Sequence, residues 1–133
     1  MTTINSVLGP LNTRDLGFTL MHEHVISQGP VARNFPELFG PRFLDRIVTG
    51  ITEAREGGVK TIVDATTFDL GRDVNFLAEI SRRTGVNIVA SSGWWMSTPS
   101  FLKGHSPDLF ADIFVREIEE GIGRCSDKAR GAR

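Results

Sequence analysis

The sequence predicts an α/β fold in which helices cover a parallel sheet. Residues 58–65 and 85–91 each begin with a glycine and continue as a short run of mainly apolar and β-branched residues, which is typical of buried strands. A segment with helical periodicity precedes each run. Strands that alternate with helices indicate a parallel sheet, because each crossover returns the chain to the same end of the sheet.

Three strand–helix units are expected after a short N-terminal segment. Residues 4–11 predict an extended or hairpin segment, and residues 17–21 predict the first strand. The strands at 58–65 and 85–91 follow it. The loops after the strands are long, and such loops build the functional site of a parallel α/β fold.

Helix boundaries follow from proline, glycine and a capping serine. The first helix follows Pro41 and ends before Gly57, which is the usual asymmetry between helix starts and helix ends. The second has its apolar residues between 74 and 80 and lies before Gly85, and the third follows Ser106 as N-cap with Pro107 in its first turn. The apolar faces predicted to cover the sheet are Phe43, Leu44, Ile47, Val48, Ile51 and Ala54; then Val74, Leu77, Ala78 and Ile80; then Leu109, Phe110, Ile113, Phe114 and Ile118.

Composition favours a cytoplasmic globular protein. The chain has 133 residues, 40% apolar and 23% charged, with a formal net charge of -1, so neither nucleic acid nor a membrane is expected as a partner. No apolar run approaches the ~20 residues of a membrane span. The start lacks the features of a signal peptide, and the single cysteine, Cys125, excludes a disulfide framework.

The clearest chemical signal is His22-Glu23-His24, which directly follows the first predicted strand. Alternate residues of a strand point to the same face, so both imidazoles project together while Glu23 faces away. Imidazole binds zinc and similar ions. The alternative is two unrelated histidines, one bonded to a backbone carbonyl and one in solvent. Their position at a strand end within a strand–helix repeat favours metal binding.

Residues 17–24 closely resemble the opening of the phosphotriesterase and phosphotriesterase-like lactonase family, within the amidohydrolase superfamily. The resemblance continues through residues 58–66, 70–73 and 114–122 and covers the chain to about Gly123. It implies a TIM (β/α)8 barrel, of which this chain would form the first three strand–helix units.

The resemblance also implies a binuclear metal centre, usually of zinc or a similar divalent ion. His22 and His24 match the two first-strand ligands of the more buried metal. The family's other ligands are a carboxylated lysine on the fourth strand, two later histidines and a final aspartate. A metal-bound hydroxide then attacks a small-molecule phosphotriester, lactone or other ester, and family members can be homodimeric. With only two of these ligands, this chain is expected to be inactive alone.

By resemblance, Trp95 falls where phosphotriesterases carry an aromatic wall for the leaving group. It is therefore a candidate substrate-binding residue, and the alternative is that Trp94 and Trp95 pack within their loop. The lactonases carry a tyrosine at the position of Trp95, and this chain contains no tyrosine. The tryptophan therefore argues against a lactonase.

Four other polar residues favour structural roles. Asp64 ends the second predicted strand, and a hydrogen bond to nearby backbone is preferred over support of a metal ligand. Asp73 favours the N-terminus of a helix, and Arg72 is expected to pair with a neighbouring carboxylate. His105 is expected to be a solvated loop residue.

The pattern changes after residue 122. We predict a domain over residues 1–122 and an aberrant, disordered basic tail over residues 123–133, where no large apolar residue supplies a fourth strand. Counted in step with the family, Arg133 takes the place of the bridging lysine, and a guanidinium forms no carbamate. A shift in reading frame explains the change, and a divergent natural tail is the alternative.

Two classes of function stay open. The first is a metal-dependent hydrolase represented by its N-terminal part. The second is a non-catalytic remnant, or a small α/β domain that binds partners through an open strand edge. An incomplete barrel should also leave strand residues without opposing strands, namely Ile62, Val63, Ile88 and Val89.

Overall fold

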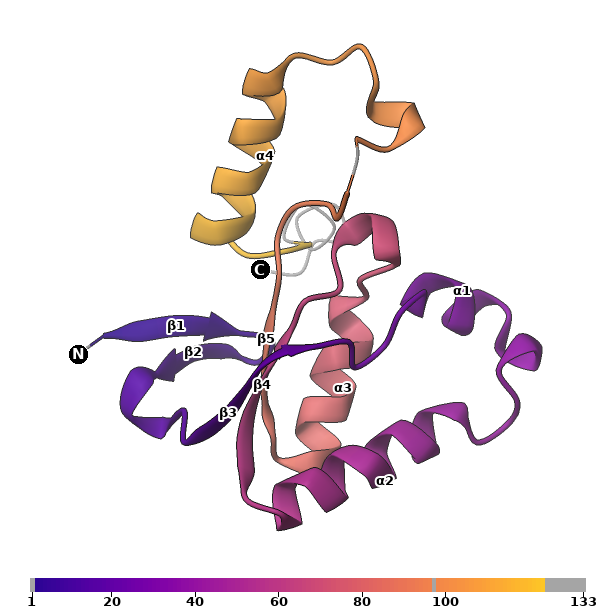
Figure 1. The fold of residues 1–133 in the computed structure, drawn as a ribbon, viewed down its shortest axis with the longest axis vertical. Coiled ribbons are helices and arrows are strands. Elements are labelled where there is room, and N and C mark those ends of the chain that lie inside the picture. Colours follow the sequence, from indigo (N-terminus) through magenta and orange to yellow (C-terminus); the bar gives the residue numbers. More distant parts are fainter. Residues whose placement is uncertain (1, 97, 124–133) are drawn as a thin grey trace, which may run out of the picture.

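The computed structural model describes residues 2–96 and 98–123. These residues form an N-terminal hairpin, a three-stranded sheet and four α-helices (Figure 1). The strands are β1 (Thr3–Ser6), β2 (Gly9–Asn12), β3 (Phe18–Glu23), β4 (Val59–Asp64) and β5 (Asn87–Ala90), and the helices are α1 (Gly29–Asn34), α2 (Phe43–Glu56), α3 (Val74–Thr84) and α4 (Pro107–Glu119). The predicted alternation of three strands and three helices is confirmed, and one further short helix, α1, lies in the segment after β3 that was expected to be a loop.

The main sheet is parallel, with strand order β3-β4-β5. Helices α2 and α3 provide the two crossovers and lie along the same side of the sheet (Figure 1). Strand β3 extends two residues beyond the predicted end at residue 21 and so includes His22. Because the strands are parallel, their carboxyl ends lie at the same end of the sheet, and His22 lies at that end.

The core lies between the sheet and helices α2 and α3. Ile62, Leu77, Ile80 and Ile88 are each at most 1% exposed. Partly buried residues of α2, including Ile51, complete these clusters. Of the four strand residues expected to lack opposing strands, Ile62 and Ile88 are nevertheless buried, because the helices cover the face on which they lie, whereas Val63 and Val89 are only partly buried.

Helix α3 begins and ends as its sequence predicts. The carboxylate of Asp73 accepts hydrogen bonds from the backbone N–H groups of Asn75 and Phe76 at the N-terminus. Gly85 has φ 73° at the C-terminus, a left-handed conformation that glycine adopts without a Cβ clash. The helix therefore begins and ends at the predicted residues, and the structure adds that the side chain of Asp73 caps its first turn.

The N-terminal segment is an antiparallel hairpin of β1 and β2. This is one of the two forms predicted for it, an extended segment or a hairpin. Its turn approaches the sheet, because the backbone N–H of Val7 donates to the carbonyl of Ile88 at 2.9 Å. The hairpin therefore contacts β5 on the edge that is not paired with β4.

Helix α4 differs from α2 and α3 in what its apolar face contacts. Neither α2 nor α4 has a fully buried residue, but the apolar face of α2 packs against the core clusters and that of α4 does not. Ser106 caps its N-terminus as predicted, by accepting from the N–H of Leu109. The predicted apolar face does not cover the sheet: Ile118 is 65% exposed, and Phe110 and Phe114 contact Trp94. Figure 1 shows α4 standing beyond the end of the sheet.

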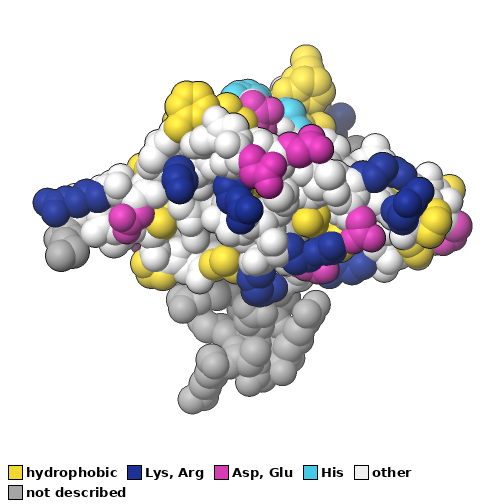
Figure 2. Space-filling view, turned by 90° about the horizontal axis from the view of Figure 1, so that it is seen from below, with side chains coloured by type: hydrophobic (Ala, Val, Ile, Leu, Met, Phe, Trp, Pro, Cys, Tyr) yellow, Lys and Arg dark blue, Asp and Glu magenta, His cyan; other side chains and the backbone are white. Residues whose placement is uncertain are grey.

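Figure 2 shows basic and acidic side chains interspersed on one face, with hydrophobic side chains between them and at the margins. Among the described residues, no helix combines the length and the apolar character needed to cross a membrane.

Candidate metal centre

His22 and His24 lie together at the carboxyl end of β3. Their ring centroids are 5.5 Å apart, with the rings nearly perpendicular, and both residues are exposed. Two nitrogens bound to one zinc lie within about 4 Å of each other, since each Zn–N bond is about 2 Å. The spacing of the two rings is therefore compatible with a shared ion.

A register shift with the residue count of a β-bulge lies in β3 between Leu20 and Glu23, at the histidine pair. Leu20 aligns with Ile62, whereas Glu23 aligns with Asp64, so three steps along β3 match two steps along β4. The additional residue falls at Met21 or His22. Bulges bend a strand and redirect its side chains, and they recur near functional sites.

A buried hydrogen-bond network supports the second histidine. Asp64 is fully buried, and its two carboxylate oxygens accept from the backbone N–H groups of Val25 at 3.0 Å and Thr66 at 2.8 Å. The hydroxyl of Thr66 lies 3.0 Å from Nδ1 of His24. The preferred role of Asp64, hydrogen bonding to nearby backbone, is confirmed. Thr66 was not among the site residues predicted from the sequence, although it follows a strand end next to the histidine pair.

The loops that follow β3 and β4 are joined at their backbones. The N–H groups of Gln28 and Gly29 donate to the carbonyls of Leu70 and Gly71, each at 2.9 Å. Gly71 has φ 84°, and a Cβ added there would lie 2.5 Å from the Cα of Gln28. This close approach requires glycine and fixes the two loops beside the histidine pair.

Trp94 and Trp95 occupy different environments in the loop after β5. Trp94 packs edge-on against Phe110, with centroids 4.9 Å apart. Trp95 is 65% exposed, and its backbone N–H donates to both carboxylate oxygens of Asp69 at 3.0 and 3.2 Å. Trp94 thus packs against helix α4, whereas the indole of Trp95 is exposed. Asp69, which the sequence analysis did not single out, fixes the backbone at Trp95.

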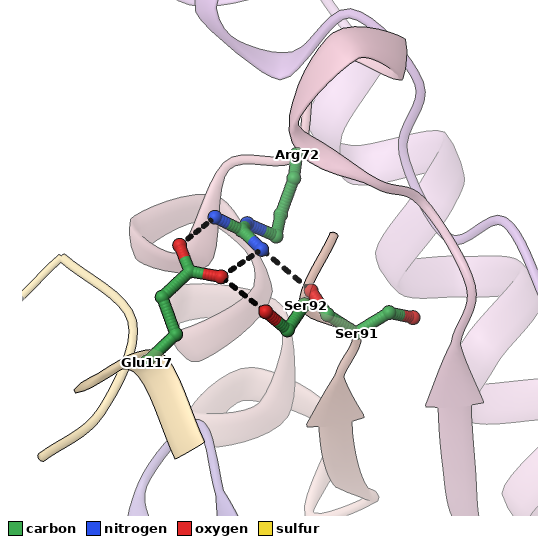
Figure 3. A network of polar contacts seen from close by, with 4 residues as sticks. All are labelled: Arg72, Ser91, Ser92 and Glu117. Carbon is green, nitrogen blue, oxygen red and sulfur yellow. Dashed lines mark hydrogen bonds and ion pairs between the residues drawn. The ribbon is translucent and has the colours of Figure 1, made fainter. Parts of the chain in front are cut away.

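An ion-pair network joins α4 to the carboxyl ends of the strands (Figure 3). Arg72 donates to both carboxylate oxygens of Glu117, at 2.5 and 3.2 Å, and to the carbonyl of Ser91 at 2.6 Å. Ser92 also donates to Glu117, at 2.6 Å. The expected pairing of Arg72 with a carboxylate is confirmed, and its partner comes from 45 residues further along the chain.

The remaining polar candidates have structural environments. Asp73 caps α3 and also forms an ion pair with Arg33. His105 is exposed, as expected, and helps line an open hollow of about 630 Å³ together with Trp94, Phe110 and Lys103. Neither His22 nor His24 lines this hollow.

The described residues provide only part of a metal shell. Within residues 2–96 and 98–123, no group of three or more His, Cys, Asp or Glu side chains is arranged to hold a metal. The two imidazoles fit a divalent ion such as zinc in donor type and spacing, but they leave its shell open. The predicted boundary at residue 122/123 stays a prediction, because residues 124–133, including Arg133, lie outside the described residues.

Parallel strands joined by helices, with histidines where the first parallel strand ends, define the N-terminal part of a (β/α)-barrel. A sequence model of the Phosphotriesterase family matches residues 2–130. The chain is 37% identical to a phosphotriesterase homology protein of Mycobacterium tuberculosis, over 97% of this chain and 43% of that protein. It is 36% identical to an aryldialkylphosphatase of Saccharolobus solfataricus, over 90% of this chain and 39% of that protein.

Structural comparison agrees with the sequence matches. The structure of the phosphotriesterase from Mycobacterium tuberculosis matches 91% of this chain and 41% of its own chain, with a TM-score of 0.79 at 35% identity. This chain belongs to the phosphotriesterase family and has the fold of the N-terminal part of its barrel. It spans less than half the length of these relatives.

Proposed function

We propose that the chain provides the first-strand metal ligands of a metal-dependent hydrolase acting on phosphotriester, lactone or other ester bonds. The observation that carries this proposal is the pair of exposed imidazoles of His22 and His24, 5.5 Å apart at the carboxyl end of β3. Membership of the phosphotriesterase family supports it.

Each residue has a role in this proposal. His22 and His24 hold a divalent ion, for which zinc fits the donor set, and Asp64 and Thr66 hold the second histidine. When bound, such an ion supplies Lewis-acid activation of water and of the bond under attack. Trp95, whose backbone Asp69 fixes, offers an exposed aromatic face to the leaving group of a small substrate.

Metal binding by the histidine pair can be tested with cobalt(II), whose visible absorption reports its ligands. We expect His22→Ala and His24→Ala each to weaken binding at least tenfold, because each removes one of two donors. His105→Ala is the matched control, since it removes an exposed histidine outside the pair. An equal loss in His105→Ala, or unchanged binding when both His22 and His24 are replaced, would contradict the proposal.

Hydrolysis needs ligands beyond this pair, because catalytic zinc sites use three protein ligands. We therefore expect the chain alone to hydrolyse paraoxon-type and lactone substrates no faster than added zinc alone. In a chimaera, residues 2–122 would replace the matching part of the Mycobacterium tuberculosis phosphotriesterase. We expect this chimaera to be active, and His22→Ala should reduce its turnover by at least 100-fold. An inactive, folded chimaera would oppose the hydrolase proposal.

One observation favours the second candidate, a domain that binds partners through an open strand edge. Phe18 and Met21 on β3 are 65% and 69% exposed, and large exposed apolar groups mark association surfaces. The chimaera separates the two candidates, because only the hydrolase requires the histidine pair for turnover.

A further inference from the structure

The two candidate ligands are held differently. Nδ1 of His24 lies 3.0 Å from the hydroxyl of Thr66, a residue 42 positions away. Within the described part of the chain, the ring of His22 forms no hydrogen bond and contacts the ring of His24. Only the second histidine therefore has a side-chain partner that can select its orientation and its tautomer.

Thr66 is itself firmly held. It is fully buried, and its backbone N–H donates to Oδ1 of Asp64 at 2.8 Å. Oδ2 of the same carboxylate accepts from the N–H of Val25, the residue after His24, at 3.0 Å. The adjacent N–H of Ala65 donates to the carbonyl of Glu23 at 2.7 Å. The buried carboxylate of Asp64 thus fixes the backbone at Thr66 and at Val25, the residue next to His24.

A neutral imidazole carries a proton on one nitrogen and a free lone pair on the other. If the hydroxyl of Thr66 accepts the Nδ1–H of His24, Nε2 keeps the lone pair that a metal needs. If the hydroxyl donates to Nδ1, the proton lies on Nε2 and blocks that atom. A partner on the second nitrogen commonly sets which nitrogen binds the metal.

We propose that Thr66 is a positioning residue of the metal site, which accepts Nδ1–H from His24 and directs Nε2 to the ion. Asp64 supports this role by fixing the backbone of Thr66 and Val25, and both of its oxygens are engaged in doing so. This inference rests on the proposed function, because it assigns a role to Thr66 only if His24 binds a metal.

The first test reads the tautomer directly in the metal-free chain. Two-bond 1H–15N correlation spectra at alkaline pH show which ring nitrogen carries the proton, and His22→Ala and His24→Ala assign the signals. We expect the Nδ1–H form for His24. Thr66→Val should shift it towards the Nε2–H form, which an unconstrained histidine side chain favours in water, and Thr66→Ser should retain the Nδ1–H form. An Nε2–H form in the unaltered chain would overturn the inference.

The second test measures cobalt(II) affinity. Loss of a partner that orients a metal-binding histidine weakens binding about 10- to 100-fold, so we expect at least a tenfold loss in Thr66→Val. Thr66→Ser should stay within about threefold. Thr84→Val is the matched control: Thr84 is 1% exposed, and its hydroxyl donates to the carbonyl of Ile80 in α3, remote from the histidines.

The two tests separate this inference from the proposed function. Unchanged affinity in Thr66→Val, with a large loss in His24→Ala, would overturn the role of Thr66 and leave the metal site intact. Affinity that is insensitive to both His22→Ala and His24→Ala would reject the metal site itself. An equal loss of cobalt(II) affinity in Thr84→Val and Thr66→Val would also overturn the role of Thr66, because removal of any buried hydroxyl would then weaken metal binding.

Discussion

The sheet with helices α2 and α3 can be compared with helix α4, which has an apolar face of similar length. In the first region Leu77, Ile80 and Ile88 are at most 1% exposed. In the second, no residue of α4 is buried, and Ile118 is 65% exposed. An amphipathic sequence thus forms a helix in both regions, but its apolar face packs against the core only in the first, where it is fully buried in α3 and partly buried in α2.

The difference shows that burial depends on neighbours as well as on the helix itself. Helices α2 and α3 lie beside each other on the sheet, so each covers strands and contacts the other helix (Figure 1). Helix α4 is joined to the remainder through Glu117 and through the contacts of Phe110 and Phe114 with Trp94. Polar contacts and one aromatic cluster therefore hold α4 where a buried core holds α3.

The largest expected effect comes from truncating a core residue. Ile80→Ala should lower the free energy of unfolding by about 2–5 kcal/mol, because it leaves a cavity in the sheet region. Ile118→Ala in α4 should change it by no more than about 0.5 kcal/mol, since the side chain is largely exposed. Urea unfolding followed by circular dichroism measures both. An equal loss of stability in Ile80→Ala and Ile118→Ala would show that the two regions do not differ in how much their apolar residues stabilise the fold.

A smaller effect is expected from the ion pair that holds α4. The side chains of Arg72 and Glu117 are 8% and 17% exposed. A double-mutant cycle with Arg72→Met and Glu117→Gln should give a coupling energy of about 1.5–3 kcal/mol, the range for hydrogen bonds to charged groups.

A second ion pair provides the control for that cycle. Arg83 of α3 pairs with Asp45 of α2 at 2.7 Å, but their side chains are 39% and 60% exposed. The cycle with Arg83→Met and Asp45→Asn should give at most about 1 kcal/mol, as exposed pairs do. A coupling energy for Arg72 and Glu117 no larger than this would show that their ion pair holds α4 no more strongly than an exposed pair would.

Zinc should stabilise only the sheet region, and modestly. At ten times the dissociation constant, a ligand stabilises the folded state by about 1.4 kcal/mol. Amide hydrogen exchange should slow around His22 and His24 and stay unchanged in α4. Because two imidazoles hold zinc weakly, dialysis should remove most of it. Stoichiometric zinc by elemental analysis after a chelator wash would contradict this prediction.

The smallest effect on stability is expected at the exposed apolar residues of β3. Replacing Phe18 and Met21 with serine should change the free energy of unfolding by about 0.5 kcal/mol or less for each residue. It should nevertheless reduce self-association in sedimentation and the binding of apolar dyes, because both side chains are more than 60% exposed. A monomeric, dye-free unaltered chain with a sharp thermal transition would show that these surfaces do not drive association.

Much of the fold was predictable because its signals are local. The capping roles of Asp73 and Ser106 and the left-handed Gly85 depend on residues within one helical turn. Strands β4 and β5 follow from β-branched runs after a glycine, although β5 is shorter than the predicted 85–91. The apolar face of α2 packs against the core as its periodicity indicated.

The candidate site was predictable in part. The sequence placed His22 and His24 at a strand end, and the structure brings their rings together. It did not reveal Thr66 or Asp69, which contact residues 42 and 26 positions away. The available signal was that both follow the carboxyl end of β4, next to β3. Sequence position alone could not show which polar side chain there would meet which partner.

By itself, the sequence determined which segments form strands and helices and where several helices are capped. It also determined that two histidines, separated by one residue, lie at a strand end. These features depend on backbone preferences and on side chains within a few residues. Only the tertiary structure decided the register shift between Leu20 and Glu23, the contact of His24 with Thr66, and the exposure of α4. Those features depend on strand register and on neighbouring surfaces. Both are established only when the sheet forms and brings together residues that are far apart in the chain.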